Sequence, residues 1–282
     1  MPEGPEIRIA ADKIAAVLVG LPLQSVSLSQ PHIAEHAAVL AASYVTAVDT
    51  HGKAMLMRFE NGLTLYSHNQ LYGRWFVQRR GEWPDTRRTL RVALHTSTHS
   101  ALLYSASEIA VLTPAALAVH PFLCRLGPDV LGADSDPSVL AKRLDLPQFR
   151  GRALASLYLD QGFVAGIGNY LRSEILFAAG LAPTRRPRDL SAKERLTVAQ
   201  ATLDISQHAY RERGVTIPSA LLKRLRAAGA KRRDSRYAVF GRDGHPCHRC
   251  TTPVVRLDLA GRRIYLCPHC QPTQFTAAVS KK

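Results

Sequence analysis

The chain has 282 residues, long enough for two domains, and its hydrophobic content of 46% excludes wholesale disorder. No apolar run approaches the roughly 18 residues of a membrane span, and no export signal is visible, so we expect a cytoplasmic protein. The formal net charge is +15, from 37 Lys and Arg against 22 Asp and Glu. Such a charge favours a polyanionic partner, nucleic acid first of all, although charge alone would equally fit a merely basic protein.

The first half of the chain reads as one helix followed by many short strands. Residues 3–20 place Ile7, Ile14 and Leu18 on one stripe at helical spacing, and Gly20 is a suitable stop. From residue 23 to 112 the pattern is β-rich. Residues 55–66 form a hairpin signal around Asn61-Gly62, and residues 90–96 and 101–105 are further strand candidates. We expect a sandwich-like sheet domain.

The pattern changes to helical between residues 137 and 214. Ser191 and Glu194 have the spacing of a capping box, which should open a helix that runs to about Arg213. Three glycines within residues 162–168 argue against a continuous helix there. We therefore expect a helix, turns and a second helix between residues 154 and 179, and a mobile tail after Pro272.

Four of the five cysteines form two C-x-x-C pairs, Cys247 with Cys250 and Cys267 with Cys270. Sixteen residues separate the pairs, and four thiolates make the closed tetrahedral set of a structural zinc site. Strand candidates at 254–257 and 264–266 predict a zinc-bound β-hairpin, although four unrelated thiols are the alternative. His248 and His269 should be exposed rather than ligating. Cys124 stands apart and should be a buried small hydrophobe.

Several motifs in order resemble the formamidopyrimidine-DNA glycosylase and endonuclease VIII family. They are PEGPE at 2–6, Lys53, YSHNQLYG at 66–73, HPFLCRLGPD at 120–129, LDQ at 159–161, GIGNYLR at 166–172 and the cysteine hairpin. PEGPE and the Gln-Leu-Tyr triplet resemble the endonuclease VIII branch. The resemblance implies an α+β fold with a β-sandwich catalytic domain (1–130), a helical helix–two-turn–helix domain (131–236), a zinc hairpin (237–272) and a tail (273–282).

The resemblance also implies a catalytic set for a bifunctional glycosylase and AP lyase. With Met1 removed, the secondary amine of Pro2 would attack the sugar C1′ and form a Schiff base. Glu3 would transfer protons during base loss, and Lys53 would assist strand cleavage by β,δ-elimination. By the residues alone, Pro2 and Glu3 are adequately explained as the start of a helix, and Lys53 as a surface charge.

DNA contacts follow from the same resemblance. Gln70, Leu71 and Tyr72 would fill the gap left by a flipped-out nucleotide, although a strand end with a partly buried leucine is the plain alternative. Arg125 and Asn169 should contact phosphates. Arg262 should reach the phosphate beside the lesion, with Arg263 as the alternative register.

One region departs from the endonuclease VIII pattern. Residues 211–236 carry nine basic side chains against Glu212 and Asp234. The nine are Arg211, Arg213, Lys223, Arg224, Arg226, Lys231, Arg232, Arg233 and Arg236. The segment could be a linker made soluble by charge, or could affect base preference. We expect a monomer that removes oxidised pyrimidines from damaged double-stranded DNA. An oxidised-purine glycosylase and a non-catalytic zinc-ribbon DNA-binding protein are the alternatives.

Overall fold

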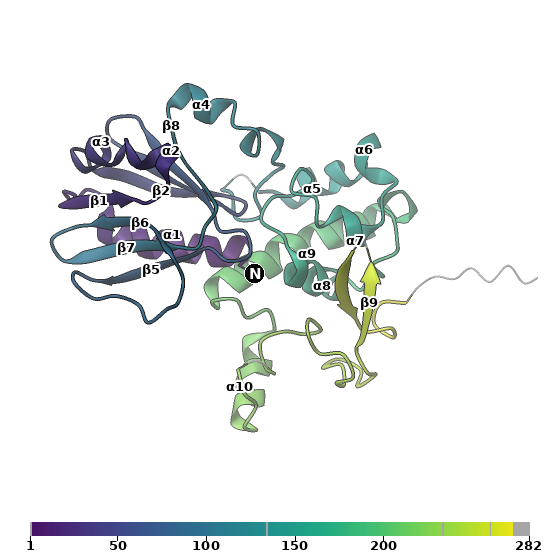
Figure 1. Ribbon diagram of the computed structural model, residues 1–282. Coiled ribbons are helices and arrows are strands. Elements are labelled where there is room, and N and C mark those ends of the chain that lie inside the picture. Colours follow the sequence, from purple (N-terminus) through teal and green to yellow (C-terminus); the bar gives the residue numbers. More distant parts are fainter. Residues whose placement is uncertain (1, 134, 233, 260, 273–282) are drawn as a thin grey trace, which may run out of the picture. The chain divides into compact units, whose positions relative to one another are not determined.

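The structure is a computed structural model that describes residues 2–133, 135–232, 234–259 and 261–272. It divides into two compact units, residues 1–129 and 130–282, which are drawn from purple to teal and from teal to yellow in Figure 1. The predicted removal of Met1 and the predicted mobile tail (273–282) concern residues outside the described ranges. None of the described helices is long and apolar enough to cross a membrane.

The first unit holds two antiparallel sheets of four strands (Figure 1). One has the order β2-β3-β4-β8, with β2 (Val45–His51), β3 (Ala54–Phe59), β4 (Thr64–His68) and β8 (Glu108–Leu112). The other has the order β1-β6-β7-β5, with β1 (Ser25–Leu28), β6 (Leu90–His95), β7 (His99–Tyr104) and β5 (Arg74–Arg79). The helical segments are α1 (Gly4–Leu18), α2 (Pro31–Ala34), α3 (Ala37–Ala41), α4 (Pro114–Ala118) and η1 (Leu123–Arg125).

Both sheets and α1 contribute to one apolar core. Ile7, Ile14 and Leu18 of α1 are buried against Met57 of β3 and Leu103 of β7, among others. The predicted helix and hairpin are therefore confirmed, the latter with Gly62 at φ +83 in the turn between β3 and β4. Burial of α1 in the core fixes the direction in which its first residues leave the sandwich.

The second unit is helical and ends in a two-stranded hairpin. Its helices are α5 (Pro137–Leu144), α6 (Pro147–Arg150), α7 (Leu154–Leu157), α8 (Asn169–Ala178), η2 (Pro187–Asp189), α9 (Ala192–Arg211) and α10 (Ser219–Ala227). The hairpin pairs β9 (Val255–Leu259) with β10 (Arg262–Leu266). The predicted interruption between α7 and α8 is present, with Gly166 at φ +98. The predicted boundary between the helical domain and the zinc hairpin stays a prediction, because both lie in this unit.

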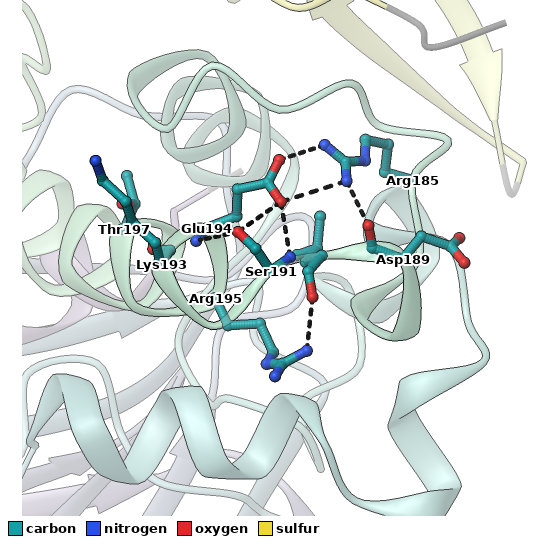
Figure 2. Close-up of polar contacts among 8 residues, drawn as sticks. Arg185, Asp189, Ser191, Lys193, Glu194, Arg195 and Thr197 are labelled. Atoms are coloured by element: carbon teal, nitrogen blue, oxygen red, sulfur yellow. Dashed lines mark hydrogen bonds and ion pairs between the residues drawn. The ribbon is translucent and has the colours of Figure 1, made fainter. Parts of the chain in front are cut away.

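The longest helix, α9, begins at the predicted capping box (Figure 2). Ser191 Oγ accepts a hydrogen bond from the Glu194 amide at 3.2 Å, and the Glu194 carboxylate accepts one from the Ser191 amide at 2.7 Å. Glu194 also pairs with Arg185, which donates to the Asp189 carbonyl. Such a cap contributes about 1 kcal/mol, and the ion pair ties the helix start to the preceding loop.

Helix α8 is buried on every side, since residues 170–177 are all buried. The Glu174 carboxylate accepts hydrogen bonds from the Val239 amide at 2.9 Å and the Phe240 amide at 2.8 Å, which lead into the cysteine hairpin. Arg249 donates to the Phe177 carbonyl at 3.1 Å and lies over its ring. Polar contacts from one helix therefore hold the hairpin segment in place.

Two expectations were wrong. Cys124 is exposed, and its thiol donates to the Ala118 carbonyl at 3.1 Å. It lies on the one-turn helix η1, where no periodic pattern indicates which side faces the core. His248 is partly buried rather than exposed, and burial together with Arg242 and Arg224 lowers its pKa to about 4.

Candidate active site

The N-terminal residues enter α1 in a fixed conformation. The Glu6 carboxylate accepts a hydrogen bond from the Glu3 amide at 3.0 Å, and the Glu3 carbonyl accepts the first helical bond from Ile7 at 3.1 Å. Glu3 is only 3% exposed, and Pro2 is partly buried. Sequence reasoning gave Glu6 no more than a favourable effect on the helix dipole. Its reach back to Glu3 is a specific positioning contact, for which the PEGPE spacing was the available signal.

Lys53 lies in the turn between β2 and β3. Gly52, at φ +60, forms the turn, and its amide donates to the Asp129 carboxylate at 2.6 Å. Ala54, the next residue, pairs with His68 at the end of β4. The turn is thus fixed from two sides, and Lys53 is brought near the residues that follow β4. Asp129 was part of a quoted motif, but its role in holding this turn was not predicted.

The loop 69–73, after β4, carries the three predicted DNA-contacting residues. Leu71 and Tyr72 are 57% and 69% exposed, so two large side chains that are neighbours in the chain both lie at the surface. The Gly73 amide donates to the Asn69 carbonyl at 2.7 Å. A Cβ at Gly73 would meet the Asn69 Cα at 2.6 Å, so this tight closure requires glycine.

Gln70 has a φ of +47, in the left-handed region that non-glycine residues rarely adopt. Its amide nitrogen Nε2 donates to the Glu108 carboxylate at 2.8 Å, and its Oε1 accepts from Ser107 Oγ at 3.2 Å. Its backbone amide donates to His68 Nδ1 at 3.1 Å. Three contacts therefore hold Gln70, and none of the partners was singled out from the sequence.

The pKa shifts of His68 and Glu108 agree with the hydrogen bonds that these residues accept from Gln70. Burial and the charge of Lys53 lower the pKa of His68 despite nearby Glu108, so its neutral Nδ1 can accept the Gln70 amide. Burial tends to raise the pKa of Glu108, but hydrogen bonds from Tyr66 and Gln70 outweigh it and lower the pKa overall. Glu108 is therefore a carboxylate at neutral pH. The Tyr66 hydroxyl donates to its second oxygen at 2.7 Å.

Arg125 lies in the segment 120–125, which contacts residues of β4. The ring of Phe122 contacts His68 edge-on at 5.1 Å between centroids, and His120 lies 4.4 Å from Tyr66. Arg125 is exposed, and its Nε donates to the Pro121 carbonyl at 2.8 Å. The structure thus places Lys53, the loop 69–73 and the segment of Arg125 around the end of one sheet.

In the second unit, Asn169 begins α8 directly after the glycine-rich turn. Its Oδ1 accepts a hydrogen bond from Arg172 Nη2 at 2.6 Å, which leaves the donor nitrogen of the amide to face a ligand. The same Nη2 donates to the Arg263 carbonyl at 2.9 Å, and Nη1 donates to the Ala155 carbonyl at 2.7 Å. Arg172 is fully buried. It ties Asn169 to the hairpin strand β10.

Arg262 and Arg263 both lie at the start of β10, and both side chains are exposed. They occupy successive strand positions, so their side chains point to opposite faces of the hairpin. The structure does not choose between the two predicted registers. Because the Arg263 carbonyl is held by Arg172, the hairpin tip has a fixed attachment to α8.

The four hairpin cysteines converge, with their sulfur atoms within 4.8 Å of one another. Cys247 Sγ and Cys270 Sγ are 3.9 Å apart, and Cys250 Sγ and Cys267 Sγ are 3.4 Å apart. Zn–S bonds of about 2.3 Å in a tetrahedron place sulfurs about 3.8 Å apart. Burial raises the pKa values of Cys267 and Cys270, whereas hydrogen bonds with Thr252 lower that of Cys250. Four thiolates this close require a cation, so the donor set fits a thiophilic metal ion.

Comparisons with known proteins agree with this arrangement. The family models for the formamidopyrimidine-DNA glycosylase N-terminal domain and H2TH domain match residues 1–107 and 126–219. The chain is 48% identical to endonuclease 8 of Escherichia coli O17:K52:H18 and 47% identical to that of Shigella sonnei, over 96% of this chain and all of each relative.

A solved structure shares the fold at lower sequence identity. Lactococcus lactis Fpg (MutM), in a complex with DNA that contains N7-benzyl-Fapy-dG, superimposes with a TM-score of 0.79. The identity is 19%, with 96% of this chain and all of that chain covered. The two family models and the full-length relatives lead to one conclusion: the chain belongs to the formamidopyrimidine-DNA glycosylase and endonuclease VIII family.

Proposed function

We propose that this enzyme, a bifunctional DNA glycosylase and AP lyase of that family, excises oxidised pyrimidines through a Schiff base on Pro2. The observation that carries the proposal is the chain start, where Pro2 precedes a buried Glu3 whose backbone is held by Glu6. The capping box of Glu3 and Glu6 fixes the start of α1, so the residue that follows Pro2 is held in one conformation. The endonuclease 8 relatives, similar over their whole length, support the same reading.

In the proposed mechanism, the Pro2 nitrogen attacks C1′ as the bond from C1′ to the base breaks. The base leaves with its bonding electrons and takes up the proton that the Pro2 nitrogen releases, and Glu3 supplies the proton needed at the sugar ring oxygen. The C1′–N bond then becomes an iminium as the ring opens. The iminium acidifies the neighbouring C2′ hydrogen, so elimination expels the 3′-phosphate. Lys53 would stabilise phosphate charge during elimination.

Recognition of the damaged nucleotide is proposed to use two surfaces. The exposed Leu71 and Tyr72 would fill the space left in the base stack, since a flat or apolar side chain replaces the lost stacking. Arg125, Asn169 and Arg262 would bind phosphates, with Arg263 as the alternative to Arg262. We further propose that the enzyme acts as a monomer on double-stranded DNA in the cytoplasm.

Substrate preference separates the two enzymatic alternatives. With matched duplexes that differ only in the lesion, thymine glycol and dihydrouracil should be excised faster than oxoguanine, by about tenfold or more in the single-turnover rate constant. The measurement is single-turnover excision at equal enzyme excess. A reversed order would favour the oxidised-purine alternative, and the absence of excision of all three would leave the zinc-ribbon binding protein.

We propose that the four cysteines hold one structural zinc ion. The closed set of four sulfurs leaves no open coordination position, so the ion would stabilise the hairpin rather than take part in the reaction. The hairpin has a small apolar core of its own, and Glu174 and Arg172 attach it to α8. Bound zinc would therefore hold Arg262 in place for DNA.

Removal of one cysteine tests the zinc proposal. Cys267→Ser should release the metal, displace Arg262 and lower incision strongly, while the β-sandwich unit stays folded because its core is separate. Metal content by elemental analysis, incision rate and DNA affinity are the measurements. Cys124→Ser is the matched control, because Cys124 is exposed and is not one of the four clustered cysteines. Full metal content and normal incision in Cys267→Ser would refute the proposal.

Part of the basic connector is helical, since α10 covers residues 219–227. Leu222 of α10 is buried against Val215 and Ile217, whereas Lys223, Arg224 and Arg226 are exposed. The amphipathic pattern orients a basic face toward solvent. We propose that this face contacts DNA phosphates beyond the lesion.

Neutralisation of that face should weaken the salt dependence of binding. In Lys223→Gln/Arg224→Gln/Arg226→Gln, the slope of log Kobs against log salt should fall by roughly 1 to 3, since each phosphate contact contributes about 0.9. Base excision by saturating enzyme should be unchanged. The exposed trio Arg186, Arg188 and Lys193, changed to Gln, provides the control. Equal slopes for the two triple variants would exclude a DNA contact at α10.

A further inference from the structure

The loop 69–73 is anchored on both sides of its tip by residues outside it. On one side, Gln70 is bound by Glu108, the first residue of β8, and by Ser107, which directly precedes the strand. On the other side, Arg88 donates to the Tyr72 carbonyl. Leu71, between the two anchors, extends into solvent with 57% of its surface exposed. Contacts at Gln70 and at Tyr72 thus fix the backbone on both sides of the tip, while the Leu71 side chain projects into solvent.

Gln70 does not adopt its backbone conformation by preference. A φ of +47 is unfavourable for a side chain with a Cβ, so the surrounding contacts must hold it there. The strongest is the bond to Glu108, because the acceptor is ionised and a hydrogen bond to a charged group contributes more than a neutral one. Without Glu108, Gln70 can return to an ordinary φ, and Leu71 would then point in another direction.

Glu108 is itself fixed by the sheet rather than by the loop. It begins β8 and pairs in register with His68 of β4. Tyr66, which is fully buried in β4, donates to the carboxylate oxygen that Gln70 does not use. The Glu108 carboxylate is therefore fixed by the strands β4 and β8, and it in turn fixes the Gln70 side chain.

From these contacts we propose that Glu108 is the positioning residue of the DNA-intercalating loop, setting the conformation of Gln70 so that Leu71 is directed into the duplex. The proposal rests on the proposed function, because it assigns the loop to duplex DNA. Glu108 does not touch the reacting atoms.

The proposal predicts a defect that depends on the substrate. Glu108→Ala should lower kcat/KM for a lesion in a fully paired duplex by roughly tenfold, because insertion of the loop must accompany base flipping there. The same variant should cleave the same lesion in an unpaired bubble within about twofold of the parent enzyme, since the stack is already open. A variant that failed to fold would lose both activities, so the bubble substrate is an internal control.

Two further variants distinguish positioning from the loop's function as such. Glu108→Gln keeps one acceptor oxygen but loses the charge and the second acceptor, so it should recover only part of the duplex activity. Leu71→Ala, which removes the inserting side chain, should show the same duplex-selective loss as Glu108→Ala. A selective loss in Leu71→Ala without one in Glu108→Ala would overturn the role of Glu108 and leave the proposed function intact. Loss in neither would overturn the proposed role of the loop.

Discussion

Acetylation of the Pro2 nitrogen, or retention of Met1 in front of it, should abolish strand incision, with a loss on the order of a thousandfold or more, as for other covalent nucleophiles. The reason is the chemistry of the α-amine. Its pKa near 7.7–8.0 in model compounds leaves a substantial fraction unprotonated at neutral pH, whereas a lysine near 10.4 is nearly all charged. The proline ring also restricts the direction of the nitrogen lone pair.

Borohydride trapping provides the measurement. The unmodified protein should form one covalent complex with lesion-containing DNA, and peptide mapping should place the adduct on a chain that begins at Pro2. The blocked protein should bind the same DNA without crosslinking, which separates loss of the nucleophile from loss of affinity. Persistent crosslinking through Lys53 in the blocked protein would contradict the assignment of Pro2.

Glu3→Gln should separate the two activities of the enzyme. Base loss requires proton transfer, so excision of an oxidised base should fall by about 10²- to 10⁴-fold. An abasic site has already lost its base and still presents an aldehyde to Pro2, so its cleavage should be largely retained. The substitution should preserve the start of α1, because Gln keeps a side-chain oxygen that can accept the Glu6 backbone amide, as the Glu3 carboxylate does in the capping box.

The measurement is a pair of single-turnover rates, one on a duplex with thymine glycol and one on a duplex with an abasic site. Glu6→Gln is the matched control. It keeps an oxygen that can accept the Glu3 amide, so both rates should stay close to those of the parent enzyme. Equal loss of both rates in Glu3→Gln would remove Glu3 from the role of proton donor.

The parts of the fold that were predictable from the sequence depend on neighbours in the chain. Helix α1 follows from apolar residues three and four apart, the β3–β4 hairpin from Asn61-Gly62, and the start of α9 from Ser191 and Glu194. The cysteine cluster is equally local, because two C-x-x-C turns bring the sulfurs together once β9 and β10 pair. In each case a short local sequence pattern determines the structure of the element.

The contacts that arrange the site were not predictable in this way. Glu108 is 38 residues from Gln70, and Arg172 is 91 residues from Arg263. Neither pair has a spacing that indicates contact, since only the completed fold brings the elements together. Asp129 and Gly52 show the same limit, at a separation of 77 residues. The family motifs predict which residues take part in catalysis and DNA binding. The residues that hold them in position are apparent only in the folded protein.

Helix α8 has a consequence for how much its sequence can vary. Surface helices accept many substitutions on their solvent side, but residues 170–177 have no solvent side. Arg172 and Ser173 bind β10, and Glu174 binds the Val239 amide. A neutral replacement of Arg172 or Glu174 would leave buried partners without their charge-assisted bonds. In a library of random variants selected for repair of oxidised DNA, this helix should therefore tolerate the fewest changes of any in its unit, and its two buried charges should be the last positions to diverge among descendants of this protein.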